Sequence, residues 1–329
     1  MIIQKLIDSK MLTVASKAQD NPPSLEGLDF FAVGYAAKDY PAQTPRLWNA
    51  LYAQFGLNVR NIRLIGSPEV AGDVFDAYRN DDRFLGGDVG AGIKDKAWVI
   101  VDQIDPLARA MQAINVVVRT DHKLVGYNTD GHGYVAGLQQ VMDATDKTIL
   151  ILGGGGTANA IAFAAAAARM KLIILNRTVS KANDLAVRVN QFCNKAVAVS
   201  GGREMISAEA PKADVIVSVI DDPHSPLDQF SALGEIELPA TPDSLSRNVA
   251  TATKVMRTLK PGVLISDVAL RDKPTATLQL AASTGLKTQD GRPMVLEQAI
   301  LAFWLVNQRL LKPRRITQAQ VAKAMRQIA

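Results

Sequence analysis

The stretch Thr148-Ile149-Leu150-Ile151-Leu152-Gly153-Gly154-Gly155-Gly156-Thr157-Ala158 decides the fold of this chain. Its first five residues form an apolar run typical of a buried strand, and the residues after Ala158 are typical of a helix. Glycines in such a turn let backbone amides approach a pyrophosphate, and the helix N-terminus adds a partial positive charge. The stretch predicts a dinucleotide-binding turn formed by Gly153, Gly155, Gly156, Thr157 and Ala158, and its alternative is a glycine-rich turn without a ligand.

Strands and helices alternate on the C-terminal side of this turn. The apolar runs 172–175, 196–199, 215–219 and 263–268 are typical of strands, whereas 158–169 and 181–190 are typical of helices. Such alternation indicates a parallel sheet with helices on both faces. We therefore predict a Rossmann domain in the middle of the chain.

The residues after the second strand of this domain indicate which dinucleotide binds. Asn176-Arg177-Thr178 follows the strand, and Lys181 lies just beyond. An NAD site usually places Asp or Glu there for the ribose 2′-hydroxyl, whereas Arg can hold a 2′-phosphate through two hydrogen bonds. These four residues favour NADP over NAD; the alternative is that Arg177 is a solvated loop residue.

The sequence pattern of the N-terminal half predicts a separate α/β domain. Short apolar strands at 30–33 and 61–65 alternate with helical patterns at 45–57 and 69–78, before a glycine-rich loop at 84–94 and a hairpin formed by 113–119 and 124–127. Two helical patterns, 296–311 and 317–328, end the chain. We predict an N-terminal extension at 1–29, a substrate-binding and catalytic domain at 30–129, a Rossmann domain at 130–289 and C-terminal helices at 290–329.

The amino-acid composition argues against several classes of protein. The 329 residues are 48% hydrophobic and 21% charged, which is ordinary for a globular enzyme. The formal charge of +5 is mildly favourable for binding anionic ligands. The basic residues form no stripe interleaved with aromatics, so we expect no nucleic-acid partner. Three histidines without ligand spacing predict no metal site, and no apolar run is long enough for a membrane helix. The single cysteine, Cys193, allows no internal disulfide, which suits the cytoplasm.

Two polar residues are candidates for proton transfer. Oxidation of a secondary alcohol needs a group that takes the hydroxyl proton, and a lysine facing an aspartate can do this. Lys94 ends the first glycine-rich loop, and Asp130 lies in Tyr127-Asn128-Thr129-Asp130-Gly131-His132-Gly133, which joins the two domains. Taken alone, Lys94 also fits a surface lysine and Asp130 a turn residue.

Four motifs together resemble the shikimate dehydrogenase family. They are Ala113-Ile114-Asn115-Val116-Val117, Asn128-Thr129-Asp130-Gly131, the glycine turn with Asn176-Arg177-Thr178, and the segment from Asp290-Gly291 to Glu297-Gln298. They occur in the family's order and span roughly residues 30–311. A folate-linked dehydrogenase of similar architecture fits the second and fourth motifs poorly.

The resemblance implies an architecture and a reaction. It implies an N-terminal α/β substrate domain, a Rossmann NADP domain and C-terminal helices that return to the first domain. Lys94 matches the family's catalytic lysine and Asp130 its partner, and Asn115 and Gln298 match residues that bind substrate hydroxyls. The implied reaction, part of aromatic amino acid biosynthesis, is reversible reduction of a ring ketone such as 3-dehydroshikimate with NADPH. We expect a monomer or a homodimer.

The departures from the family lie in the substrate half. The family's Ser-x-Ser-Pro, which holds the substrate carboxylate, is Ala42-Gln43-Thr44-Pro45 here, so Thr44 retains one of two hydroxyls. The family's Asn-Val-Thr-x-Pro-His-Lys is Asp88-Val89-Gly90-Ala91-Gly92-Ile93-Lys94. Each lost hydrogen bond to a carboxylate costs about 1.5–3 kcal/mol, and Asp88 would repel a carboxylate if it faced the pocket.

These departures leave three hypotheses open. The first is a shikimate or quinate dehydrogenase whose loops have drifted without consequence. The second is a paralogue with the same redox chemistry and a different, less acidic polyol substrate. The third is a non-catalytic NADP-binding sensor, although a sensor needs neither Lys94 nor Asp130.

Overall fold

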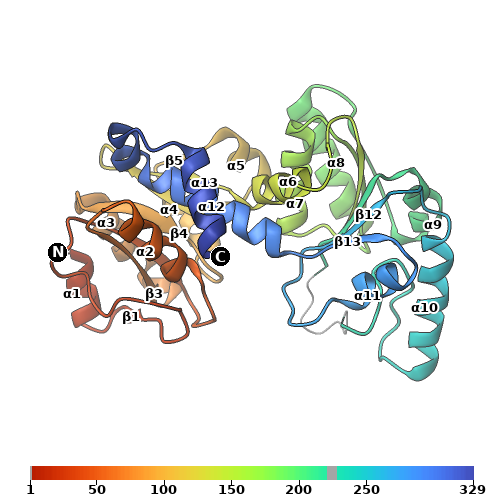
Figure 1. The fold of residues 1–329 in the computed structure, drawn as a ribbon, viewed down its shortest axis with the longest axis horizontal. Helices are drawn as coiled ribbons and strands as arrows, with labels where there is room; N and C mark the ends of the chain where they lie inside the picture. The colour runs from red at the N-terminus through yellow and green to blue at the C-terminus, as the bar shows by residue number, and fades with distance from the viewer. Residues whose placement is uncertain (1, 221–227) are drawn as a thin grey trace. The chain divides into compact units, whose positions relative to one another are not determined.

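The computed structural model describes residues 2–220 and 228–329, and these form two compact units (Figure 1). Unit 1 contains Met1–Thr129 and Leu296–Ala329, and unit 2 contains Asp130–Val295. The C-terminal helices therefore return to the first unit, as predicted. Among the described residues, no helix is both long and apolar enough to cross a membrane.

Unit 1 is built on a mixed seven-stranded sheet of order β1-β3-β2-β4-β6-β7-β5. The strands are β1 (Thr13–Val14), β2 (Phe30–Ala36), β3 (Val59–Ile65), β4 (Phe84–Asp88), β5 (Gln103–Ile104), β6 (Val116–Thr120) and β7 (Lys123–Tyr127). The central strands β3, β2 and β4 run parallel, so their carboxyl ends meet at one edge. Strand β6 pairs antiparallel with β4 and with β7, and the predicted hairpin is confirmed.

Helices cover both faces of this sheet. They are α1 (Ile2–Asp8), α2 (Thr44–Gln54), α3 (Ala71–Asn80), α4 (Lys94–Ile100), α5 (Pro106–Met111), α12 (Arg292–Leu311) and α13 (Gln318–Ile328). Alternate residues of β2 divide between two apolar cores. Phe31 packs with Ile3 and Phe75 of α1 and α3, whereas Ala32 packs with Trp48 and Phe303 of α2 and α12.

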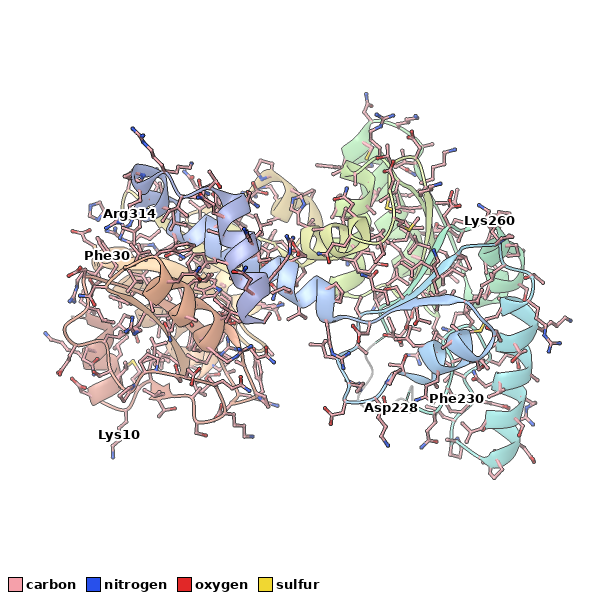
Figure 2. The ribbon with its side chains drawn as sticks, viewed as in Figure 1. Lys10, Phe30, Asp228, Phe230, Lys260 and Arg314 are labelled. Carbon is pink, nitrogen blue, oxygen red and sulfur yellow. The ribbon has the colours of Figure 1, made fainter. Side chains whose placement is uncertain are left out.

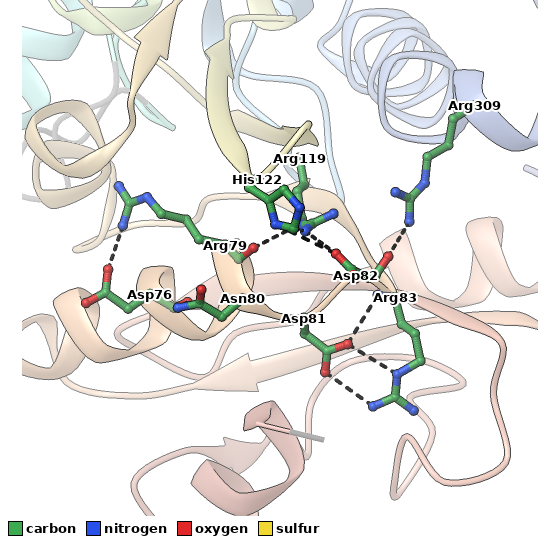
Figure 3. Close-up of polar contacts among 9 residues, drawn as sticks. All are labelled: Asp76, Arg79, Asn80, Asp81, Asp82, Arg83, Arg119, His122 and Arg309. Atoms are coloured by element: carbon green, nitrogen blue, oxygen red, sulfur yellow. Dashed lines mark hydrogen bonds and ion pairs between the residues drawn. The ribbon is translucent and has the colours of Figure 1, made fainter.

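Charged residues tie α12 to the turn between α3 and β4 (Figure 3). Arg309 of α12 donates from Nη2 to the carbonyl oxygen of Asp82 at 2.8 Å. Arg119 of β6 forms an ion pair with the Asp82 carboxylate and donates from Nε to the carbonyl oxygen of Arg79 at 3.0 Å. These contacts join the hairpin and the last long helix to a single turn of unit 1.

Unit 2 is the predicted Rossmann domain. Its six-stranded parallel sheet has the order β10-β9-β8-β11-β12-β13, the doubly wound order of dinucleotide-binding folds. The strands are β8 (Thr148–Leu152), β9 (Lys171–Leu175), β10 (Ala198–Gly201), β11 (Val215–Ser218), β12 (Leu264–Asp267) and β13 (Lys287–Gln289). The helices are α6 (Asp130–Gln139), α7 (Gly156–Ala167), α8 (Val179–Cys193), α9 (Ile206–Glu209), α10 (Pro242–Met256) and α11 (Ala276–Ser283). The α/β fold class is confirmed.

Two features of unit 1 differ from the sequence prediction. Residues 2–29 belong to the unit: Ile3, Leu12 and Leu25 are buried in its core, and β1 pairs with β3. The first half of the predicted glycine-rich loop is the central strand β4, where a Cβ on Gly87 would lie 1.9 Å from the Val33 carbonyl oxygen. Glycine appears there because neighbouring strands approach closely, which a local pattern does not distinguish from a loop.

Candidate functional site

The glycine turn of unit 2 forms an open cradle at the carboxyl end of β8. Gly153 has φ +138°, and a Cβ on it would lie 2.6 Å from Cγ2 of Val219, which follows β11. Gly153 therefore lies where the strand order reverses between β8 and β11, the usual ligand position in doubly wound sheets.

The rest of the turn has room for a ligand. A Cβ on Gly155 or Gly156 would meet no described atom within 4 Å. Gly155 caps α7 without a side-chain hydrogen bond, Thr157 is half-buried, and Ala158 is fully buried against the sheet. This arrangement fits a pyrophosphate held by backbone amides at the start of α7.

The predicted 2′-phosphate residues lie between β9 and the first turn of α8. Asn176 donates from Nδ2 to the carbonyl oxygen of Thr178 at 3.0 Å, which shapes the turn, and Arg177 and Lys181 are exposed. Burial lowers the pKa of Arg203, and the nearby charge of Arg177 lowers it further. Arg203 follows Gly201-Gly202 at the end of β10 and donates from Nη2 to the carbonyl oxygens of Ala232 and Gly234 at 2.8 and 2.9 Å.

A buried polar cluster in unit 1 joins two of the predicted substrate residues. Asn115 donates from Nδ2 to Oγ1 of Thr129 at 3.0 Å and to Oε1 of Gln298 at 3.2 Å. Thr129 donates from its backbone N to Oδ1 of Asn115 at 2.9 Å and from Oγ1 to Oε1 of Gln298 at 3.1 Å. Thr129 is fully buried. The sequence analysis did not single it out, because a threonine before Asp130 matches no spacing that marks a binding residue.

The same unit holds the other substrate candidates and one of the two catalytic candidates. Thr44 is the first residue of α2, and Lys94 is the exposed first residue of α4. The Asp88–Lys94 segment is linked to the polar cluster, because Val89 N donates to the Asn115 carbonyl oxygen at 2.8 Å. Asp130 is the first residue of α6 and belongs to unit 2, so its pairing with Lys94 stays a prediction.

Asp88 is paired with a cation that the sequence analysis did not single out. Its Oδ2 accepts a hydrogen bond from Nη1 of Arg63, whose side chain is only 3% exposed. Burial by itself would lower the pKa of Arg63, but the charge and hydrogen bonds of Asp88 and Tyr40 raise it overall. The carboxylate repulsion expected from Asp88 is therefore offset by Arg63.

Comparison with known proteins identifies the family. Residues 136–231 match the family model described as shikimate / quinate 5-dehydrogenase. A protein of Bacillus cereus (strain AH187) named shikimate dehydrogenase (NADP(+)) is 33% identical over 227 residues, which cover 68% of this chain and 73% of that protein.

Solved structures share the fold. A shikimate 5-dehydrogenase from Listeria monocytogenes, in complex with shikimate and NAD, matches with a TM-score of 0.73 and 22% identity, covering 88% of this chain and 94% of that one. A quinate dehydrogenase from Corynebacterium glutamicum in complex with NAD matches with a TM-score of 0.69 and 21% identity over 91% and 99% of the two chains. Given the sequence identity to the Bacillus protein over most of its length, the chain belongs to the shikimate dehydrogenase family.

Proposed function

We propose that this protein is an NADP-dependent oxidoreductase that interconverts a cyclic polyol acid and its ketone, of the shikimate or quinate type. The observation that carries the proposal is the combination of two residue sets in one chain. Unit 2 has an open glycine cradle followed by Arg177, and unit 1 has the Asn115–Thr129–Gln298 cluster on the same framework as Lys94.

The name of the Bacillus relative supports both the cofactor and the class of substrate. Because Arg177, Thr178 and Lys181 follow β9 without an acidic residue, the residues present suit a 2′-phosphate better than a free 2′-hydroxyl. The Bacillus relative is named as a dehydrogenase, and this favours an enzyme over a non-catalytic sensor. The oligomeric state that we propose is a monomer or a homodimer.

Each residue set has a role in the proposed reaction. Asn115 and Gln298 have amide groups that bind ring hydroxyls and orient the carbon to be oxidised. Lys94, with Asp130 as its proposed partner, takes the proton of the reacting hydroxyl during oxidation and returns it to the carbonyl oxygen during reduction. NADP supplies the hydride acceptor in one direction and the hydride donor in the other. Arg177 and the α7 N-terminus hold its phosphates.

Lys94→Met tests the catalytic proposal. General acid–base catalysis contributes about 10²–10⁴-fold to a rate, so kcat with shikimate or quinate should fall by at least about 10²-fold. NADP binding, measured by titration, should not change, because the cofactor residues lie in unit 2. The matched control is Lys96→Met, which removes an exposed lysine from the same short helix. Wild-type protein that turns over no cyclic polyol acid with NADP would overturn the proposal.

A further inference from the structure

Three polar side chains form a compact cluster at the carboxyl edge of the unit 1 sheet. Arg63 of β3 donates from Nη1 to Asp88 at the end of β4 and from Nη2 to Oη of Tyr40. Tyr40 lies in the loop between β2 and α2, and the Arg63 Cζ is 4.8 Å from its ring centroid. A buried guanidinium needs a counter-charge, and Asp88 supplies it, so the cluster carries no net charge.

Two glycines lie next to this cluster, and the cluster fills the space that their missing side chains leave. Gly34 is the register partner of Arg63, and a Cβ on it would lie 2.6 Å from Oδ1 of Asp88. A Cβ on Gly90 would lie 2.5 Å from Oη of Tyr40 and 2.6 Å from Nη2 of Arg63. The guanidinium and the tyrosine hydroxyl therefore occupy the volume that a side chain at position 90 would take.

The cluster is connected to the proposed substrate residues by short stretches of backbone. Asp88 directly precedes Val89, whose N–H donates to the carbonyl oxygen of Asn115 at 2.8 Å. Tyr40 precedes Thr44, the first residue of α2, by four positions, and Gly90 precedes Lys94 by four. The carboxyl edge of a parallel sheet is where such folds bind ligands.

The hydrogen-bond pattern sets the direction of the tyrosine proton. Oη of Tyr40 accepts a guanidinium N–H from Arg63, so its own O–H is directed to another acceptor. Contact with a cation makes that hydroxyl a stronger donor. Tyr40 as a residue is half-buried, so it is not sealed from solvent, and its contact with Arg63 holds the hydroxyl in one place.

We propose that Tyr40, oriented by Arg63 and Asp88, donates a hydrogen bond to the carboxylate of the substrate and so determines specificity for the acid. The inference rests on the proposed function, because only a cyclic polyol acid offers this carboxylate. In this proposal a polarised phenol replaces the aliphatic hydroxyls that are missing at Ala42 and Gly90.

Tyr40→Phe, assayed with a polyol acid and with its methyl ester, tests the inference. Loss of one hydrogen bond to a charged group should raise KM for the acid by about 10- to 100-fold, with kcat changed by less than about threefold. The KM for the ester, which lacks the charge, should change little, so the variant loses the wild-type preference for the acid. Tyr35→Phe is the matched control, because that hydroxyl donates to the Ser67 carbonyl oxygen at 2.9 Å.

Gly90→Ala is a second variant that keeps the tyrosine hydroxyl but displaces it. Its KM for the acid should rise as in Tyr40→Phe, and combining the two changes should add little. An unchanged KM in Tyr40→Phe, or equal losses for acid and ester, would overturn the specificity role while leaving the proposed reaction intact. Absence of turnover by the wild type is a different result, which overturns the proposed function itself.

Discussion

We propose that the preference for NADP depends on Arg177. It is exposed after β9, with Lys181 one turn further and no carboxylate between them. Arg177→Gln should raise KM for NADP by about 10- to 100-fold and leave KM for NAD unchanged, because only NADP has the 2′-phosphate. Steady-state kinetics with both cofactors measure this. Lys195→Gln, which removes an exposed cation elsewhere in unit 2, is the control. Equal losses for NAD and NADP would contradict a 2′-phosphate role.

Two glycines of unit 2 should respond to alanine in opposite ways. A Cβ on Gly131 would lie 2.0 Å from the Ala160 carbonyl oxygen, where α6 packs against α7. Gly131→Ala should therefore lower the free energy of unfolding by about 1–3 kcal/mol. Gly156→Ala has open space around its Cβ and should fold normally, but should weaken NADP binding because its methyl group would enter the proposed pyrophosphate site. Urea denaturation and NADP titration separate the two effects; weakened folding in both variants would be evidence against a ligand cradle.

Asp214 holds the starts of three neighbouring strands together. Its Oδ2 accepts from Thr148 N at 2.8 Å and its Oδ1 from Nζ of Lys260 at 3.2 Å, while Leu264 N donates to its carbonyl oxygen at 3.1 Å (Lys260 is labelled in Figure 2). Burial by itself would raise the pKa of Asp214, but the hydrogen bonds from Thr148 and Lys260 to its carboxylate and the charges of Lys260 and Lys147 lower it overall.

Because the carboxyl pKa of Asp214 is lowered in the folded protein, its contribution to the free energy of unfolding depends on pH. The contribution of Asp214 is present above its unfolded pKa of about 3.9 and is lost as the pH falls through the lower folded value. Asp214→Asn should lower the free energy of unfolding by about 1–3 kcal/mol at pH 7, and the difference should shrink below about pH 4. Urea denaturation at several pH values measures it, with the exposed Asp272→Asn as control. A difference that is constant with pH would contradict this account.

Helix α13 connects α12 with α2, which carry two of the proposed substrate residues. Arg326 donates from Nε and Nη2 to Oε1 of Glu297 at 2.9 and 2.7 Å, and Nη1 of Arg46 donates to the carbonyl oxygen of Ile328 at 3.0 Å. Glu297 is buried and directly precedes Gln298. The tail after Pro313 is therefore part of the framework of the proposed substrate residues.

Arg326→Met should disturb stability and substrate binding together. Loss of its hydrogen bonds to a buried carboxylate should cost about 1–3 kcal/mol in unfolding free energy and raise KM for the polyol through displacement of Gln298. Adding Glu297→Gln should recover part of both losses, because it removes the buried charge that lost its two hydrogen bonds from Arg326. A double-mutant cycle with kinetics and denaturation measures the coupling; fully additive effects would show that the pair is not coupled.

The two units differ in chain connectivity, and we therefore expect them to differ in their ability to fold alone. Unit 2 is one continuous segment, Asp130–Val295, and contains every predicted cofactor-binding residue. A fragment of residues 130–295 should fold and bind NADP with a Kd within about threefold of that of the full chain, without turnover. At 100 times its Kd, NADP should stabilise the fragment by about 2.7 kcal/mol. Calorimetric titration and thermal unfolding check both values, and a folded fragment without NADP binding would contradict the assignment of the cofactor site.

Residues 1–129 should not fold stably alone. Phe303 and Val306 of α12 and Met325 of α13 complete one of the two cores of unit 1, and all three are buried. Full burial of each such side chain contributes about 1.5–3 kcal/mol, which is large compared with the net stability of a domain. Adding residues 296–329 as a separate peptide should restore cooperative unfolding, measured by circular dichroism.

Local sequence predicted the glycine turn and five of the six strands of unit 2. Strand β13, Lys287-Thr288-Gln289, is polar and was not predicted. The other five strands contain short apolar runs and the turn is a contiguous stretch from Leu152 to Ala158, so periodicity and a motif of neighbouring residues contain the information. The same holds for the β6–β7 hairpin, whose turn residues Asp121 and His122 have φ of +46° and +62°, a conformation that Asp and His tolerate. The sequence alone therefore predicted the Rossmann domain, its glycine turn and the preference for NADP over NAD.

Tertiary structure decided the features that depend on residues far apart in the chain. Sheet order places β3, β2 and β4 side by side, and this register brings Arg63 to Asp88 across Gly34. Tertiary packing also buries Ile3, Leu12 and Leu25 in the core and brings Gln298 to Asn115. No spacing encodes these contacts, because ion pairs and buried amides form through strand pairing and helix packing between segments separated by tens to hundreds of residues. The glycine turn can therefore be predicted from neighbouring residues alone, whereas the Arg63–Asp88 ion pair forms only when the sheet assembles.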